Sequence, residues 1–170
     1  MKKILKEMEM KKIFLFFIFC FIINFSLFAD YKYCYYANKY HNFSPGIGGN
    51  NKPQQAIDGK SGACSVGKFG QITLEFEQYV FNNAGPDIRV TENGPLKGRY
   101  EVWLGAEINK MYLAGVYQEA SDVDISSISE ELDFIKFVKI VDLGDTEAIN
   151  PESKVHGVDI SLVREITNPV

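Results

Sequence analysis

Hydrophobic and polar residues alternate with a period of two over much of this chain. In residues 71–77 the apolar side chains of Ile72, Leu74 and Phe76 are separated by polar ones. Side chains on a β-strand point to opposite faces in turn, so this pattern predicts a strand with one face in a core and the other in water. The polar segment that follows contains Gly85 and Pro86, which break regular structure.

The same alternation recurs and predicts a series of further short strands. They are 31–36, a segment around Ile88 and Val90, and the segments 99–105, 110–118, 134–143 and 155–163. We predict a long surface loop over 42–58, which is rich in Gly, Pro and Asn. A single helical turn is predicted at Ser127, since Ser127 and Glu130 fit a capping box. Seven or eight strands with almost no helical periodicity indicate an all-β, single-domain antiparallel β-sandwich or jelly roll.

The first 29 residues have the pattern of a secretory signal peptide. Met10, Lys11 and Lys12 precede a long apolar run that ends at the small residue Ala29. We expect 1–29 to be removed and a domain of residues 30–170 to be exported to the periplasm, the cell surface or the medium, with no membrane span after cleavage. The alternative is an uncleaved membrane anchor, which the short run and its Asn24 disfavour.

The charge balance argues against nucleic acid as a partner. The chain has 18 basic and 22 acidic residues, and removal of 1–29 takes away five lysines and two glutamates, which leaves a net charge of −7. Nucleic-acid affinity depends on Lys and Arg contacts to phosphate. An acidic surface without a basic stripe is compatible with calcium or neutral sugars instead.

Two cysteines remain after the expected cleavage, Cys34 and Cys64. In an exported protein an even pair favours a disulfide over two free thiols. Closing a loop of about 30 residues would stabilise the fold by roughly 3 kcal/mol in the chain-entropy model. We therefore expect a Cys34–Cys64 bridge. Neither residue belongs to a C-x-x-C metal motif.

Several separated segments together resemble one known pattern. They are 43–48 (FSPGIG), 53–59 (PQQAIDG), 70–76 (GQITLEF), 85–94 (GPDIRVTENG), 137–140 (FVKI) with Asp142, and 157–160 (GVDI). In order and spacing they resemble bacterial exported cell-surface proteins with a galactose-binding-like jelly roll, which are related to discoidin-type and carbohydrate-binding modules. The resemblance implies a galactose-binding-like sandwich with a binding function, although a fold of this kind hosts many functions.

The chain departs from that pattern at two places. Relatives commonly read G-F-D-L-D-A-V near the end, whereas this chain keeps the first aspartate as Asp159 and has Ser161 in place of the second. Relatives often carry a serine-aspartate-glycine turn where this chain has 105–109 (GAEIN). Both changes weaken an inherited metal site or ligand loop.

Oxygen-bearing residues at predicted strand ends suggest a structural calcium site. The candidates are Asp58, Asp87, Glu92, Asn93 and Asp159. Calcium takes six to eight oxygen ligands from carboxylates, amides and carbonyls. In a jelly roll these strand ends would meet the long loop and pin it. The competing interpretation is that these are ordinary turn residues, since Asp and Asn favour turns.

A second candidate site is a ligand-binding surface of exposed aromatic rings. The candidates are Tyr40, His41, Phe43, Trp103, Tyr112 and Tyr117. Flat rings stack on sugar faces and anchor interfaces with little loss of entropy. Trp103 is the best candidate because it alternates with Val102 and Leu104, which are predicted to face the core, so that Trp103 faces outward. The competing interpretation is that these rings pack in the core.

No motif points to an enzyme. Neither His41 nor His156 lies in an H-E-x-x-H motif, and no G-x-S-x-G elbow is present. We therefore expect a non-enzymatic binding or adhesion module whose partner is a glycan or an envelope protein. One alternative is a structural envelope or filament-associated protein that packs on protein partners. A less favoured alternative is a glycan-processing hydrolase that uses two of the many carboxylates.

Overall fold

The computed structural model describes residues 35–57, 62–94, 98–129, 131–145 and 157–166. All of the described residues belong to one compact unit of the chain, 34–170. The predicted signal peptide, 1–29, lies outside the described residues. In the described part of the chain, no helix is long and apolar enough to cross a membrane.

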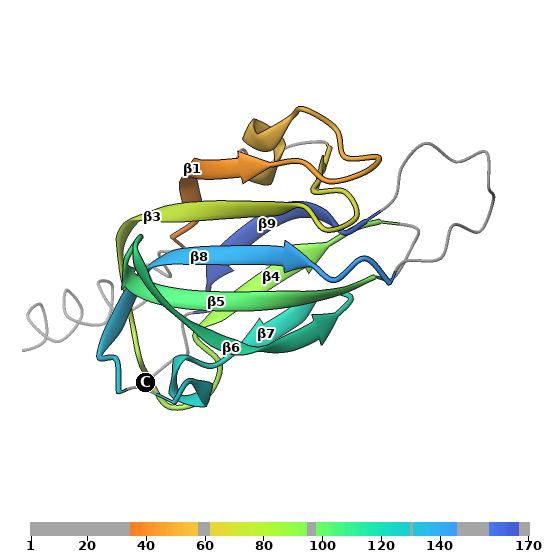
Figure 1. Ribbon diagram of the computed structural model, residues 1–170. Helices are drawn as coiled ribbons and strands as arrows, with labels where there is room; N and C mark the ends of the chain where they lie inside the picture. The colour runs from red at the N-terminus through yellow and green to blue at the C-terminus, as the bar shows by residue number, and fades with distance from the viewer. Residues whose placement is uncertain (1–34, 58–61, 95–97, 130, 146–156, 167–170) are drawn as a thin grey trace, which may run out of the picture. The chain divides into compact units, whose positions relative to one another are not determined.

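Nine strands form two antiparallel sheets among the described residues, seen as two layers in Figure 1. The five-stranded sheet has the order β1 (Ala37–Ser44), β3 (Gln71–Phe81), β8 (Phe134–Asp142), β5 (Arg99–Glu107), β6 (Lys110–Gln118). The four-stranded sheet has the order β2 (Cys64–Ser65), β9 (Asp159–Glu165), β4 (Ile88–Glu92), β7 (Ser121–Val123). The chain is therefore an all-β sandwich, as the alternation predicted.

One hydrophobic core lies between the two sheets. Ile72, Leu74 and Phe76 on β3 are completely buried, as are Val138 and Ile140 on β8. From the four-stranded sheet the core receives Ile88, Val90, Ile160 and Val163, all fully buried. Full burial of such a side chain is worth about 1.5–3 kcal/mol relative to exposure, so the period-two pattern is also the main source of stability.

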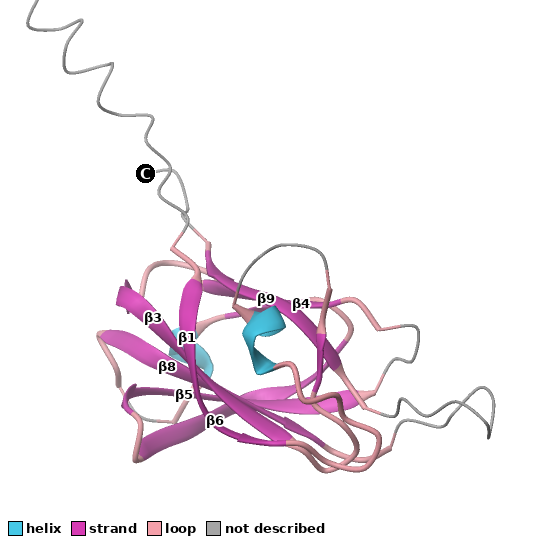
Figure 2. Cartoon of the chain, turned by 90° about the horizontal axis from the view of Figure 1, so that it is seen from above, coloured by secondary structure: helices cyan, strands magenta, loops and turns pink. Residues whose placement is uncertain are grey.

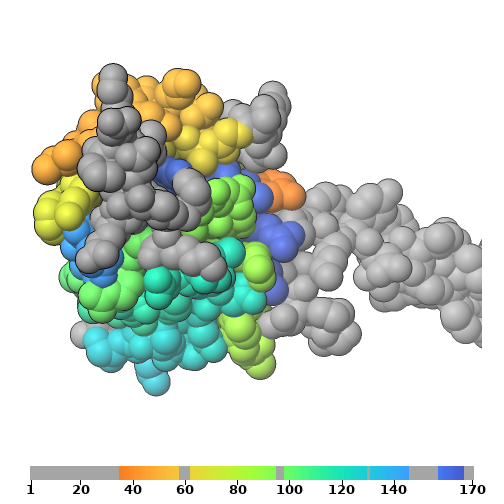
Figure 3. All heavy atoms as spheres, turned by 90° about the vertical axis from the view of Figure 1, so that its right-hand side faces the viewer, coloured from red at the N-terminus to blue at the C-terminus, as the bar shows by residue number. Residues whose placement is uncertain are grey.

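The segment predicted as a long loop is ordered by contacts with its own chain. β1 extends to Ser44, and a short 3-10 helix, η1 (Pro53–Ala56), lies beside β1 and β9 (Figure 2). Between them, the Gly46 amide donates to the Val66 carbonyl at 2.9 Å, and Ile47 and Lys68 exchange two backbone hydrogen bonds. The two loops lie side by side at this end of the sandwich (Figure 3).

Glycine permits this close approach of two backbones. A Cβ at Gly46 would lie 2.0 Å from the Lys68 carbonyl oxygen, and one at Gly70 would lie 2.0 Å from that of Val66. Neither distance is possible for a real side chain. The glycines of this segment therefore serve backbone packing.

The predicted strand over 31–36 lies mostly outside the described residues; of that segment Tyr36 makes an isolated bridge to Arg164, and the first described strand is β1, which begins at Ala37. The predicted helical turn requires correction. The helical turn is η2 (Ile125–Ser127), which begins before Ser127 and is capped by Asp124, whose side chain accepts from the Ser126 amide at 2.8 Å. Asp124 is the N-cap because its carboxylate reaches the Ser126 amide, two residues ahead. Glu130 lies outside the described residues.

Candidate functional site

One row of neighbouring residues crosses the outer face of the five-stranded sheet. His41 on β1 is opposite Thr73 on β3, which is opposite Lys139 on β8. Lys139 is in turn opposite Trp103 on β5, and Trp103 is opposite Leu113 on β6. Their strand neighbours of opposite parity point into the core, so this row faces away from it. Four separate strand pairings thus bring together residues up to 98 positions apart in the chain, from His41 to Lys139.

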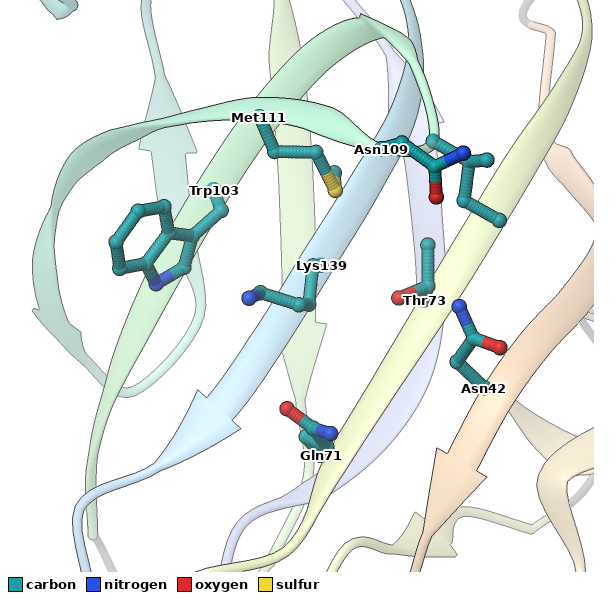
Figure 4. Close-up of a pocket in the computed structure, with 8 residues that line it drawn as sticks. Asn42, Gln71, Thr73, Trp103, Asn109, Met111 and Lys139 are labelled. Carbon is teal, nitrogen blue, oxygen red and sulfur yellow. The ribbon is translucent and has the colours of Figure 1, made fainter.

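A hollow of about 320 Å³ lies along this row. Figure 4 shows Lys139 at its centre, Trp103 and Met111 on one side, and Thr73 and Asn42 on the other. The described residues that line it are Asn42, Gln71, Thr73, Trp103, Ile108, Asn109, Met111 and Lys139. The hollow therefore combines a flat indole ring, three amide side chains, a hydroxyl group and one positive charge.

The indole of Trp103 is held in place by two polar contacts. Its Nε1 donates to Glu101 Oε2 at 2.8 Å, and Lys139 Nζ lies 4.7 Å from the centre of a Trp103 ring. A lysine cation at this distance is attracted to the negative face of the ring, by about 0.5–1 kcal/mol at an exposed site. The half-buried ring is thus oriented before any ligand arrives.

A bulge in one strand and a turn between two others position two of the amide side chains of the hollow. Asn42 has a φ of 43°, and it lies where the β1–β3 register shifts between His41 and Ser44. A bulge of this kind re-aims a side chain, and Asn42 lines the hollow instead of following the alternation of β1. Asn109 lies in the turn that joins β5 to β6.

The polar groups of the hollow are available for a ligand. Within the part of the chain that the structure describes, the side chains of Asn42, Gln71, Thr73 and Asn109 make no hydrogen bond to protein groups. A ligand that supplies donors and acceptors therefore breaks no internal hydrogen bond when it binds to them. Thr73 is almost completely buried, at 2% exposure, and forms part of the floor.

A group of charges around Glu75 lies next to the hollow and is internally balanced. Glu75 Oε2 is 2.7 Å from His41 Nε2, and Glu75 Oε1 is within 4 Å of both Lys39 Nζ and Lys136 Nζ. The hydrogen bond with His41, helped by attraction to the two lysines and opposed by burial, holds the pKa of Glu75 below its ordinary value. Lys39 and Lys136 are therefore both paired with the carboxylate of Glu75.

The structure places the six predicted aromatic residues in different environments. Trp103 and His41 lie on the outer face of the five-stranded sheet, and Tyr40 is 43% exposed on the edge strand β1. Phe43, Tyr112 and Tyr117 instead pack against the hydrophobic core. Of the six, only Trp103 lines the hollow; both tyrosines of β6 lie on the inner face because a bulge between Leu113 and Gly115 interrupts the alternation of that strand.

Three of the predicted calcium ligands lie close together where β4 ends and β9 begins. Glu92 Oε1 accepts from the Gly94 amide at 2.7 Å and from the Asp159 amide at 3.5 Å. Asn93 Nδ2 donates to Ser161 Oγ at 2.9 Å. Burial raises the pKa of both Glu92 and Asp159, and repulsion from Asp159 adds to that of Glu92.

Asp87 lies at the other end of β4 and has a different role. It is 1% exposed, and its Oδ1 and Oδ2 accept from the Asn83 and Ile125 amides, each at 2.8 Å. Burial raises its pKa despite these hydrogen bonds. Asp58 lies outside the described residues. Among those that the structure describes, no group of three or more His, Cys, Asp or Glu side chains is arranged to hold a metal ion.

The predicted disulfide is not supported. Cys64 is a free thiol that is completely buried, and burial with repulsion from Asp159 raises its pKa to about 12. Cys34 lies outside the described residues. A thiol with this environment behaves as a small apolar core residue, which is a common role for cysteine.

Two kinds of important residue were missed from the sequence. Gln71, Thr73 and Lys139 have outward parity on their strands, but Asn42 lies at a bulge and Asn109 in a turn, so only the tertiary structure shows that these residues meet. In the sequence Asp142 stands out only as part of a motif, yet its carboxylate accepts hydrogen bonds from three backbone amides, those of Phe69, Gly144 and Val158. The sequence signal for Asp142 is an acidic residue at a core-facing position of the predicted strand 134–143.

Comparison with known proteins identifies no family. No family model matches the chain, and no curated protein is similar to it in sequence. Among solved structures it is similar to a mutant of a carbohydrate binding module family 29, with 13% identity and a TM-score of 0.36 over 64% of this chain and 74% of that chain. A likeness of this size does not bear on the ligand of this chain.

Proposed function

We propose that the hollow on the outer face of the five-stranded sheet binds carbohydrate without catalysis, and that the protein acts as a binding or adhesion module after export. The observation that carries the proposal is the fixed indole of Trp103 beside amide and hydroxyl groups that have no partner in the described protein. A sugar ring offers an apolar CH face to stack on an aromatic ring and hydroxyls around its edge to bond to polar groups.

The composition of the hollow supports binding rather than hydrolysis. None of the described residues that line it is an aspartate or glutamate. Glycoside hydrolysis uses a pair of carboxyl groups, one on each side of the bond to be broken. Two carboxylates that repel each other, Glu92 and Asp159, lie instead at the ends of strands in the other sheet.

The test is binding of the purified protein to a glycan array, followed by titration of each hit. Trp103 is the only tryptophan in the sequence, so a sugar that stacks on it changes the intrinsic fluorescence of the protein directly. We expect Trp103→Ala to weaken binding by roughly 10- to 100-fold, because it removes both the buried apolar area and the stacking. Trp103→Phe retains a ring and should retain part of the affinity.

Tyr79→Ala is a matched control. Tyr79 is also an aromatic residue of the five-stranded sheet and is 47% exposed, but it packs with Phe134 and does not line the hollow. It should leave binding unchanged. Equal losses in Trp103→Ala and Tyr79→Ala, or a fluorescence signal that does not respond to any bound glycan, would place the ligand elsewhere.

One observation favours the second candidate, a structural protein that packs on an envelope protein. Leu113 and Val116 are 43% and 49% exposed, and both belong to β6, an edge strand of the five-stranded sheet. Exposed apolar groups on an edge strand suit contact with another protein. A blank glycan array, together with co-purification of an envelope protein that Leu113→Lys abolishes, would favour this alternative.

A further inference from the structure

The hollow contains a positive charge that no carboxylate in the described chain neutralises. Lys139 lines its centre, and none of the other described lining residues is charged (Figure 4). Lys139 forms no ion pair with any residue that the structure describes; its ammonium group lies over the ring of Trp103. It is half-buried, so it is less screened by solvent than a fully exposed lysine.

The neighbouring cations of the same sheet differ from Lys139 in this respect. Lys39 and Lys136 lie 3.8 and 3.6 Å from Glu75 Oε1. Glu101, which lies two residues from Trp103, uses its Oε2 to accept from the indole at 2.8 Å. The charge of Lys139 is therefore directed at whatever occupies the hollow.

We propose that the ligand of this hollow is an anionic sugar, with a carboxylate or sulfate group bound by Lys139 while the sugar ring stacks on Trp103. This inference rests on the proposed carbohydrate-binding function and narrows its ligand class. An ammonium group is a compact point charge without the planar fork of arginine, so it does not by itself select a carboxylate over a sulfate. The shared feature is a negative charge beside a stacked ring.

The net charge of the chain determines how long an acidic sugar should be used to test the proposal. The sequence carries a net charge of −4, which repels a long polyanion at low ionic strength. A short oligosaccharide places one or two charges at the hollow and avoids most of this repulsion. Trisaccharides are consequently better probes than polymers.

The experiment compares acidic sugars with neutral versions of the same sugars. Trimers of galacturonate, glucuronate and mannuronate are titrated against the full-length protein, each beside its methyl ester and its neutral parent sugar, with a sulfated galactose trimer as a further arm. The methyl ester keeps the ring and its hydroxyls and removes only the charge. We expect at least one acidic trimer to bind about tenfold more tightly than its ester, and to lose this advantage as salt is raised to about 1 M.

Variants assign the effect to one side chain. Lys139→Met should abolish the preference for the acid, seen as a loss of about tenfold in the ratio of the affinities for acid and ester, whereas Lys139→Arg should keep the preference. Lys136→Met is the matched control, since it removes a lysine of the same strand that is paired with Glu75. It should change neither affinity. The salt dependence of the unmodified protein gives a second measurement that does not depend on any variant being folded.

The outcomes separate the two proposals. Equal binding of acid, ester and neutral parent, or binding of neutral sugars alone, overturns the anionic ligand and leaves the proposed function standing. A preference for acid that survives Lys139→Met overturns the role of Lys139. No binding of any sugar on the array overturns both.

Discussion

Asp142 connects three segments of the chain, so its removal should strongly destabilise the sandwich. Asp142 is 1% exposed at the end of β8. Its Oδ1 accepts from the amides of Phe69 at 3.2 Å and Gly144 at 2.7 Å, and its Oδ2 accepts from the amide of Val158 at 2.8 Å. One carboxylate thus joins the loop before β3, the turn after β8 and the entry to β9.

The cost of Asp142→Ala follows from these three hydrogen bonds. A hydrogen bond to a charged group contributes about 1.5–3 kcal/mol, and a buried donor left without a partner costs about 1–3 kcal/mol. The three losses are not additive, because they share one acceptor, so we expect a net loss of roughly 4 kcal/mol or more. That is a large part of the 5–15 kcal/mol typical of a whole domain. Asp142→Asn keeps Oδ1 but turns a donor toward Val158, and should lose roughly 2 kcal/mol.

Urea unfolding followed by circular dichroism measures this loss, with a midpoint that falls while the slope with denaturant stays constant. Asp122→Ala is the control, because Asp122 is an exposed strand residue paired with Arg89 Nη1 at 2.9 Å. Such a surface pair is worth about 1 kcal/mol or less. A loss below about 1 kcal/mol for Asp142→Ala, or one equal to that of Asp122→Ala, would refute the reasoning.

Two further predictions concern the calcium and disulfide hypotheses. If Glu92 and Asp159 form part of a calcium site, as the sequence suggests, calcium raises the melting midpoint of the protein relative to chelator, because an ion that binds only the native state stabilises it. Asp159→Asn then removes the rise, and an unchanged midpoint in the unmodified protein overturns the calcium hypothesis. Cys64 should resist a thiol reagent until denaturant is added, since it is fully buried and its pKa is raised to about 12; a Cys34–Cys64 peptide in a non-reduced digest would contradict the free thiol.

The alternation of polar and apolar residues determined the class of fold and the face of the sheet on which individual side chains lie. Ile72, Leu74 and Phe76 are completely buried as their parity predicted, and the opposite parity of Trp103 placed it on the outer face. These properties are local, because a strand has only two faces and a core accepts only one of them. The same logic did not extend to β1, where Tyr40 and Phe43 lie on a bulged edge strand.

Only the tertiary structure decided which outward residues meet and what the buried acids do. The hollow depends on the register of β1, β3, β8, β5 and β6, and strand register is a long-range property that no single segment encodes. Asp87 was predicted as a calcium ligand, and the structure engages both of its oxygens with backbone amides. A carboxylate at a strand end suits an ion and a set of buried amides equally well, since both need oxygen acceptors. Whether such a carboxylate binds an ion or backbone amides depends on which segments the fold brings within 3 Å of it.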